Sequence, residues 1–163
     1  MTTVVLNRRN VLAAGGSVLA TGVSGLLLPA RAAQGLAPTP SMSGGSNNYF
    51  KGAPFVERIG KGGFWMSGTV RRAGDGAPLA GQRIQIWAHT TEGREEEPRS
   101  HGATVTDQNG AFRLEIPQII PIFGQPHGHL AYDSGEFKTV FLRPVMKSAK
   151  ETGLEAHFVL QPA

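Results

Sequence analysis

The sequence contains no cysteine, and this absence excludes disulfide bonds, iron–sulfur clusters, cysteine-liganded zinc sites and thiol nucleophiles. Aromatic residues make up only 7% of the 163 residues, and just two of them are tyrosines. The chain also lacks a glycine-rich phosphate loop and a serine nucleophile elbow, so nothing in it supports a nucleotide-binding or serine-hydrolase function. Its length fits a single folded domain of ordinary size.

Outside its first 33 residues, the chain carries almost no excess of positive charge. The formal net charge of +4 includes Arg8, Arg9 and Arg31, and the first 33 residues contain no acidic side chain. The remainder carries 13 basic and 12 acidic side chains. A nearly neutral domain gives no electrostatic reason to bind nucleic acid, so we expect no nucleic-acid partner.

The first 33 residues have the pattern of an export signal. Arg8 and Arg9 precede an uncharged stretch rich in Ala, Gly, Val and Leu that ends at Pro29, and alanines follow at 30, 32 and 33. The stretch is shorter and richer in glycine than a membrane span. We predict a twin-arginine-type signal peptide over 1–33 and a periplasmic or secreted protein that leaves the membrane after cleavage. An ordinary Sec signal and an uncleaved anchor are the alternatives.

The remaining chain divides into a leader and one β domain. Residues 34–47 are mostly Ser, Gly, Pro and Asn, which predicts a flexible leader before a domain over 48–163. From residue 64 onward apolar residues alternate at period two between Gly- and Asp-rich turns. This pattern predicts an all-β fold, an antiparallel β-sandwich of about seven strands. The expected strands are 64–71, 82–89, 102–106, 111–116, 127–132, 137–143 and 156–161.

His127 and His129 form the clearest candidate site. Side chains two residues apart on a strand point to the same face, so the two imidazoles converge. Such a pair can hold iron, zinc, copper or nickel, and the ligands that complete the site decide which. Two polar residues on a solvated strand face are the alternative interpretation.

An ordered series of motifs over most of residues 48–143 resembles the intradiol ring-cleavage dioxygenases, β-sandwich enzymes that open catechols with a ferric ion. The turn that leads from Gly-Ala-Pro-Leu-Ala-Gly into an Ile-Trp strand is the most specific of these motifs. The matching segments are Asn48-Tyr49-Phe50-Lys51-Gly52-Ala53-Pro54, Gly68-Thr69-Val70, Asp75-Gly76-Ala77-Pro78-Leu79-Ala80-Gly81, Ile84-Gln85-Ile86-Trp87-Ala88-His89, Gly93-Arg94, Thr106-Asp107, Gly110-Ala111-Phe112, His127-Gly128-His129 and Thr139-Val140-Phe141.

The resemblance implies a metal held by two tyrosinates and two histidines, and the histidines map onto His127 and His129. The tyrosines do not map. The first should follow the Gly93-Arg94 step, where this chain has Glu95, and the second should fall near residues 122–123, where there is no phenol. The chain's own tyrosines, Tyr49 and Tyr132, match neither position, and strand alternation puts Tyr132 on the face opposite the histidine pair.

Glu95 offers a different completion of the site. If it turns inward, two histidines and one carboxylate form a set that suits ferrous iron or zinc with open positions. His89 or His101 could supply a third nitrogen instead. Each has a plain alternative, because Glu95 begins a run of three glutamates typical of a solvated loop, and single histidines at strand ends are usually surface residues.

These observations support two functions. The first is an exported dioxygenase-like oxidoreductase that uses non-haem iron or another divalent metal and acts on a catechol or related small aromatic substrate. The second is a periplasmic binding or assembly module that has kept the fold and lost catalysis. The sequence assigns no catalytic residue, and it leaves homo-oligomerisation open.

Overall fold

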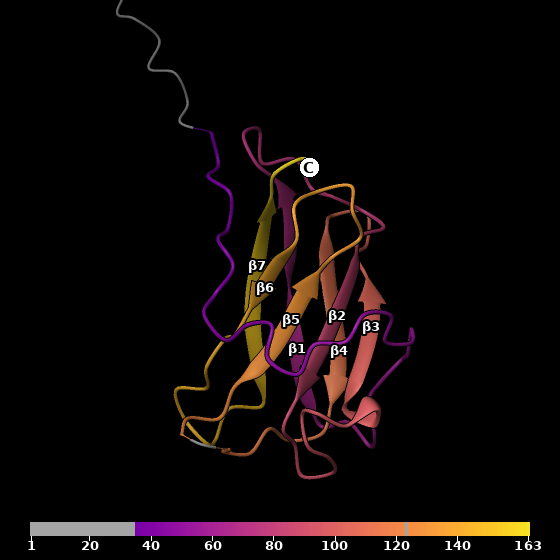
Figure 1. Cartoon of the computed structure of the whole chain (residues 1–163), viewed down its shortest axis with the longest axis vertical. Helices are drawn as coiled ribbons and strands as arrows, with labels where there is room; N and C mark the ends of the chain where they lie inside the picture. The colour runs from indigo at the N-terminus through magenta and orange to yellow at the C-terminus, as the bar shows by residue number, and fades with distance from the viewer. Residues whose placement is uncertain (1–34, 123) are drawn as a thin grey trace, which may run out of the picture. The chain divides into compact units, whose positions relative to one another are not determined.

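A computed structural model describes residues 35–122 and 124–163, so the predicted signal peptide lies outside the described residues. Seven strands form two sheets in this part of the chain (Figure 1). The elements in chain order are β1 (Phe64–Arg72), β2 (Arg83–Ala88), the 3-10 turn η1 (Pro98–Ser100), β3 (His101–Val105), β4 (Ala111–Ile116), β5 (Gly128–Tyr132), β6 (Val140–Leu142) and β7 (Gly153–Leu160). No helix among the described residues is long and apolar enough to cross a membrane.

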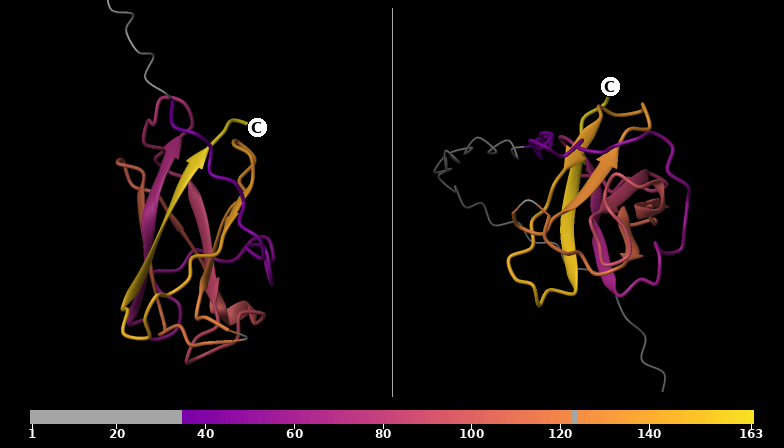
Figure 2. Two further views of the ribbon diagram at one scale, coloured as in Figure 1. Left: turned by 90° about the vertical axis from the view of Figure 1, so that its left-hand side faces the viewer. Right: turned by 60° about the horizontal axis from the view of Figure 1, so that its bottom comes forward.

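The strands pack as a sandwich of a three-stranded and a four-stranded sheet, ordered β4-β1-β7 and β3-β2-β5-β6 (Figure 2). The predicted all-β sandwich is therefore confirmed. Four of the five strand pairings are antiparallel, but β1 and β7 run parallel. Gly68 of β1 allows this parallel pair to approach closely, because a Cβ atom there would lie 1.6 Å from the main-chain carbonyl oxygen of Ala156.

The hydrophobic core lies between the sheets and follows the alternation of the strands. Ile84 and Ile86 of β2 and Leu130 and Tyr132 of β5 point into it, whereas the residues between them face the other side of the four-stranded sheet. Trp65 of β1 lies on the outer face of the three-stranded sheet. Its side chain is 41% exposed on β1 and packs under the Arg113 guanidinium, because alternation alone does not say which face of a strand is covered.

The segment before the domain is held against it. We call residues 36–49 the N-terminal strap. The amide of Thr39 donates to the carbonyl of Val159 at 2.9 Å, and the amide of Met42 donates to the carbonyl of Phe141 at 2.8 Å. The strap runs beside β7 and β6 and then crosses in front of β5 and β2 (Figure 1). These contacts do not fit the flexible leader expected over 34–47, because main-chain bonds to strand edges order the segment.

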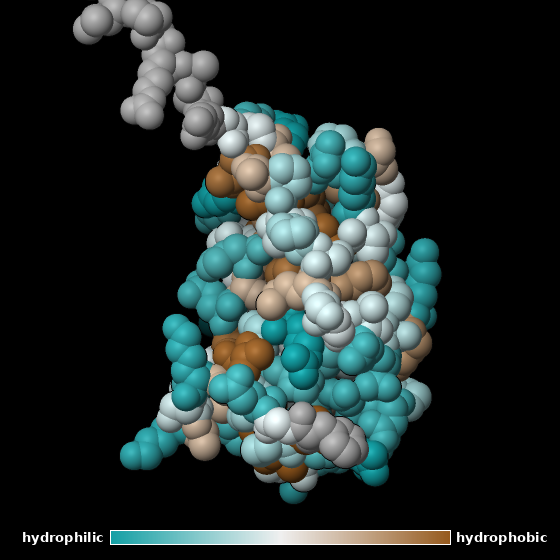
Figure 3. Space-filling model, turned by 60° about the vertical axis from the view of Figure 1, so that its left-hand side comes forward, coloured by the Kyte–Doolittle hydropathy of each residue, from teal (hydrophilic) through white to brown (hydrophobic). Residues whose placement is uncertain are grey.

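Polar residues dominate the face on which the strap lies. In the view of Figure 3, hydrophobic residues form separate small patches between hydrophilic ones. The backbone of the strap satisfies the strand edges beneath it.

Candidate metal centre

The candidate site lies on the outer face of the four-stranded sheet, beneath the strap. Strand register places His101, Trp87 and His129 in one row across β3, β2 and β5. Alternation turns all three away from the core. The strap closes this row from outside, since the Nε1 of Trp87 donates to the carbonyl of Asn47 at 2.9 Å.

Trp87 is stacked between the two histidines of this row. Its ring lies 5.3 Å from that of His101 at an interplanar angle of 7°, and 5.1 Å from that of His129 at 9°. Trp87 and His129 are fully buried, and burial lowers the pKa of His129 because the charged imidazolium would lose its hydration. His129 is therefore neutral near pH 7, the form in which a histidine binds a metal.

Three side chains converge next to this stack. Oε2 of Glu95 lies 3.3 Å from Nε2 of His129 and 3.6 Å from Nε2 of His127. The three donor atoms all lie within 4.8 Å of one another, and they are the potential metal-binding group found among the described residues. The structure thus brings together the three residues named from the sequence, Glu95, His127 and His129.

The hydrogen bonds on the far side of each imidazole fix which nitrogen faces Glu95. Nδ1 of His127 lies 2.9 Å from the carbonyl of Gln125, and Nδ1 of His129 lies 3.1 Å from the carbonyl of Gly45. A carbonyl only accepts, so Nδ1 of His129 carries the proton and its Nε2 presents a lone pair toward Glu95, whereas Nδ1 of His127 also lies 3.3 Å from the Arg143 guanidinium. Histidine ligands of metals are usually oriented in this way.

Two of the facing atoms are acceptors without a partner. Oε2 of Glu95 and Nε2 of His129 are buried and have no hydrogen-bond partner in the protein. Unpartnered buried polar atoms cost free energy, and a carboxylate oxygen beside an imidazole lone pair is unfavourable unless a cation lies between them. The residues present therefore fit a divalent metal ion held by two nitrogens and one oxygen.

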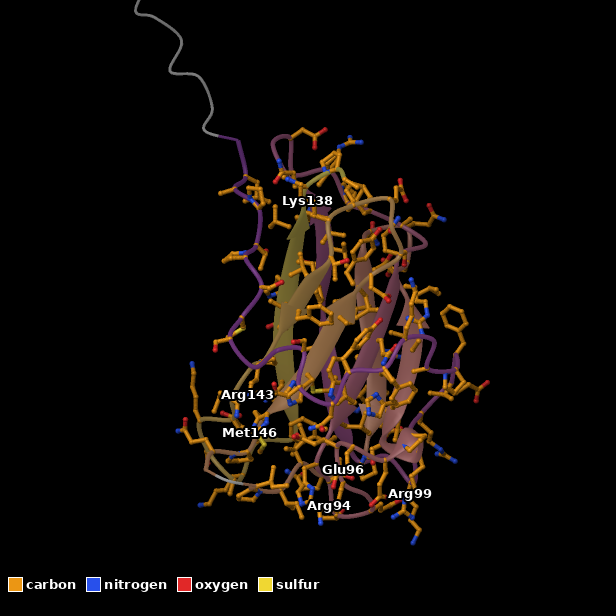
Figure 4. All side chains as sticks on the ribbon, viewed as in Figure 1. Arg94, Glu96, Arg99, Lys138, Arg143 and Met146 are labelled. Carbon is orange, nitrogen blue, oxygen red and sulfur yellow. The ribbon has the colours of Figure 1, made fainter. Side chains whose placement is uncertain are left out.

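The side chain of Glu95 points in a different direction from those of its two acidic neighbours. Glu96 pairs with Arg94 at 2.6 Å and Glu97 pairs with Arg99, all at the rim of the sandwich where Figure 4 shows the labelled side chains. Glu95 turns inward and is only 9% exposed. The run of glutamates is thus a solvated loop with one buried member.

Two contacts hold Glu95 in this inward position. The Asn48 amide donates to its Oε1 at 2.7 Å, and Nε2 of His101 lies 2.8 Å from its main-chain carbonyl. The other ring nitrogen of His101 faces the Gln85 amide at 3.3 Å. Both nitrogens of His101 are engaged, so His101 is not a third nitrogen ligand.

The remaining candidates lie elsewhere. His89, at the end of β2, is outside the cluster, although its Nδ1 is buried without a partner. Tyr132 is in the core, where its hydroxyl accepts a hydrogen bond from the Phe137 amide at 3.2 Å. The Tyr49 hydroxyl donates to Asp133, and burial followed by this bond raises its pKa. Neither tyrosine reaches the cluster.

Sequence reasoning missed two residues that contact the cluster. Asn48 reaches Glu95 from the strap, and Nη2 of Arg143, just after β6, lies 3.3 Å from Nδ1 of His127. Neither has a local sequence signal, because each contacts a residue brought near only by the tertiary fold.

Comparisons with known proteins identify the fold. No model of a known protein family matches the sequence, and no curated protein matches it. Solved structures do match. Hydroxyquinol 1,2-dioxygenase from Pseudomonas putida DLL-E4 superposes with a TM-score of 0.58 and 12% identity over 78% of this chain and 68% of its own. The fold is that of the intradiol dioxygenases.

Two further structures with the intradiol-dioxygenase fold give the same result. 3-Chlorocatechol 1,2-dioxygenase from Rhodococcus opacus 1CP has a TM-score of 0.56 and 16% identity over 80% of this chain and 73% of its own. A dioxygenase domain from Streptomyces sp. SirexAA-E has a TM-score of 0.58 and 16% identity over 78% of this chain and 100% of its own. At such identities the likeness concerns the fold, and the chemistry must be argued from the site.

Proposed function

We propose that this protein is a metal-dependent, dioxygenase-like oxidoreductase that acts on a catechol or a related small aromatic. The observation that carries the proposal is the convergence of Glu95, His127 and His129 on one buried point of an intradiol-dioxygenase fold. A metal bridging two imidazoles and a carboxylate would pair the unpartnered atoms of the cluster.

The donor set favours ferrous iron, with zinc as the other candidate. Two histidines and one carboxylate leave coordination positions open for small ligands, as in non-haem iron oxygenases. A ferric ion held by two tyrosinates does not fit, because Tyr49 bonds to Asp133 and Tyr132 lies in the core. When bound, iron supplies the positive charge that favours a deprotonated diol and the redox chemistry of ring cleavage.

The chain's own residues prepare this site. Glu95 supplies a carboxylate oxygen, and the two histidines supply ring nitrogens whose imidazoles are held by the carbonyls of Gln125 and Gly45. The strap over Trp87 keeps bulk water from the imidazoles, which strengthens every electrostatic interaction within the site.

A binding module without turnover is the second candidate. The burial of His127 and His129 favours it, because a small aromatic reaches their Nε2 atoms only if the strap or the loop around Glu95 gives way. A metal in such a module would stabilise the fold without taking part in chemistry.

The proposal includes export. The arginine pair Arg8-Arg9 supports passage through the twin-arginine route, which carries proteins already folded and could deliver the domain with its metal bound. Replacing both by lysine keeps the charge and should abolish periplasmic accumulation in fractionated cells. Undiminished periplasmic protein in that variant contradicts the twin-arginine route.

The deciding experiment measures metal and turnover on the same sample. Metal content of the purified protein is determined by mass spectrometry, and the chelated protein is titrated with ferrous iron, zinc and copper. Oxygen uptake is then followed with catechol. Metal with oxygen uptake supports the dioxygenase, and metal without uptake supports the binding module. A parent protein that binds no metal, or a His127→Ala/His129→Ala variant that keeps full occupancy, refutes the dioxygenase and leaves the binding module standing.

A further inference from the structure

Three consecutive parts of the N-terminal strap contact the candidate metal centre. The Gly45 carbonyl lies 3.1 Å from Nδ1 of His129, the Asn47 carbonyl accepts from Trp87 at 2.9 Å, and the Asn48 amide donates to Oε1 of Glu95 at 2.7 Å. The first two are main-chain contacts that many residues could make. The third depends on the side chain, so it gives Asn48 a role that can be tested alone.

Asn48 also has an unusual backbone. Its φ of 58° makes it the one non-glycine residue among the described residues with a positive φ. This left-handed conformation is unfavourable for an L-residue, although asparagine tolerates it better than most. Such strain tends to persist at functional sites, where surrounding contacts impose it. Here the strained residue directs its amide at a candidate metal ligand.

We propose that Asn48 is a positioning residue for Glu95, an inference that rests on the proposed metal-dependent function. An amide can only donate to a carboxylate, so Asn48 occupies Oε1 and leaves Oε2 facing the two imidazoles. Glu95 is thereby restricted to a single donor oxygen. Asn48 in this way keeps the number of protein donors at three and the remaining coordination positions open.

The backbone of Glu95 is held separately, which isolates the effect of Asn48. His101 contacts the main-chain carbonyl of Glu95 at 2.8 Å, and the Trp87 ring supports His101 from below at an interplanar angle of 7°. Loss of the Asn48 amide therefore leaves the loop in place and frees only the carboxylate. A freed carboxylate can rotate away or offer both oxygens to a metal.

Asn48→Gly is the variant of choice. Glycine adopts a positive φ without strain, so the backbone path is kept while the amide is removed. Asn48 is exposed, and its loss opens no cavity in the core. The matched control is Asn47→Gly, which removes the same chemical group from the neighbouring exposed residue but keeps the main-chain carbonyl that Trp87 uses.

The experiment titrates chelated full-length protein with cobalt(II), whose visible absorption bands report the number and geometry of its ligands. We expect Asn48→Gly to bind cobalt about 10- to 100-fold more weakly than the parent, the usual effect of losing a residue that orients a ligand. We also expect altered bands and an unchanged melting temperature of the metal-free protein. Asn47→Gly should match the parent in affinity and spectrum.

The outcomes distinguish the role of Asn48 from the existence of the metal site. A parent that binds cobalt, with an Asn48→Gly variant of equal affinity and identical spectrum, overturns the role of Asn48 and leaves the metal site standing. Equal weakening by Asn47→Gly overturns it too, because the effect would then belong to the strap in general. A parent that binds no cobalt and no ferrous iron overturns the proposed function itself, and the positioning role with it.

Discussion

Replacing Glu95 by glutamine should stabilise the metal-free protein and abolish its response to metal. The two side chains have nearly the same shape, so the change alters charge and hydrogen-bonding capacity alone. Asn48 donates to Oε1, and this bond orients the glutamine so that its new NH₂ group takes the place of Oε2. That group lies where Oε2 is 3.3 Å from Nε2 of His129 and 3.6 Å from Nε2 of His127. In the variant, an NH₂ group that can donate to Nε2 of His129 replaces a carboxylate oxygen that can only accept.

The size of the effect follows from the atoms involved. A buried polar atom without a partner costs about 1–3 kcal/mol, and the substitution gives partners to two such atoms. We expect a net gain of about 1–3 kcal/mol in the free energy of unfolding of the metal-free protein. For a domain of this size that raises the melting temperature by roughly 3–10 °C.

Metal should stabilise the parent and leave the glutamine variant unchanged. At a free metal concentration 100-fold above the dissociation constant, binding stabilises the parent by about 2.7 kcal/mol. The glutamine variant should gain nothing, because its NH₂ group cannot ligate a cation. The assay is thermal unfolding of both proteins, with chelator and with ferrous iron or zinc.

Glu96→Gln is the matched control, since Glu96 is the exposed neighbour of Glu95 and pairs only with Arg94 at the surface. Surface pairs contribute about 0–1 kcal/mol, so this variant should melt close to the parent and keep the full response to metal. A Glu95→Gln protein that melts below the parent without metal, or that retains the metal-induced shift, would refute the reasoning about facing acceptors.

Three further predictions follow from the same geometry. The His127→Ala/His129→Ala variant should lose its metal by mass spectrometry, whereas Tyr132→Phe should keep it, because that hydroxyl lies in the core. Loading with ferric ion should give no visible tyrosinate charge-transfer band, and a band that disappears in Tyr49→Phe would contradict the assignment of ligands. Gly68→Ala should destabilise the domain by at least about 2 kcal/mol in urea titration, since its Cβ would lie 1.6 Å from a carbonyl oxygen of β7.

Much of the fold could be predicted because alternation and turn residues are local signals. All seven expected strands exist, and their ends shift by a few residues. The parallel pairing of β1 with β7 could not be predicted, because it depends on which strands meet across the whole chain. The exposure of Trp65 cannot be predicted from the sequence for a related reason: period-two patterns divide a strand into two faces without saying which one is covered.

In the site, too, the features set by local sequence spacing could be predicted, and the contacts between distant parts of the chain could not. The convergence of His127 and His129 follows from their spacing of two on a strand, and their two Nε2 atoms do face the same carboxylate. Glu95 could be named only because a resemblance pointed to its position, since its neighbours Glu96 and Glu97 are solvated. Asn48 begins one of the segments that carry the resemblance, but its contact with Glu95 could not be predicted, because the two residues are 47 positions apart in the sequence.

The stack of Trp87 on His129 gives the protein an optical probe of its own site. An indole stacked on an imidazole of the proposed metal site lies close enough for an iron, cobalt or copper ion bound there to quench its fluorescence. Trp65, on the exposed face of the opposite sheet, is remote from the cluster and emits as a solvated residue, which separates the two signals by wavelength. Occupancy of the site can thus be followed in real time by the blue-shifted part of the emission, without a label and at protein concentrations too low for absorption spectroscopy.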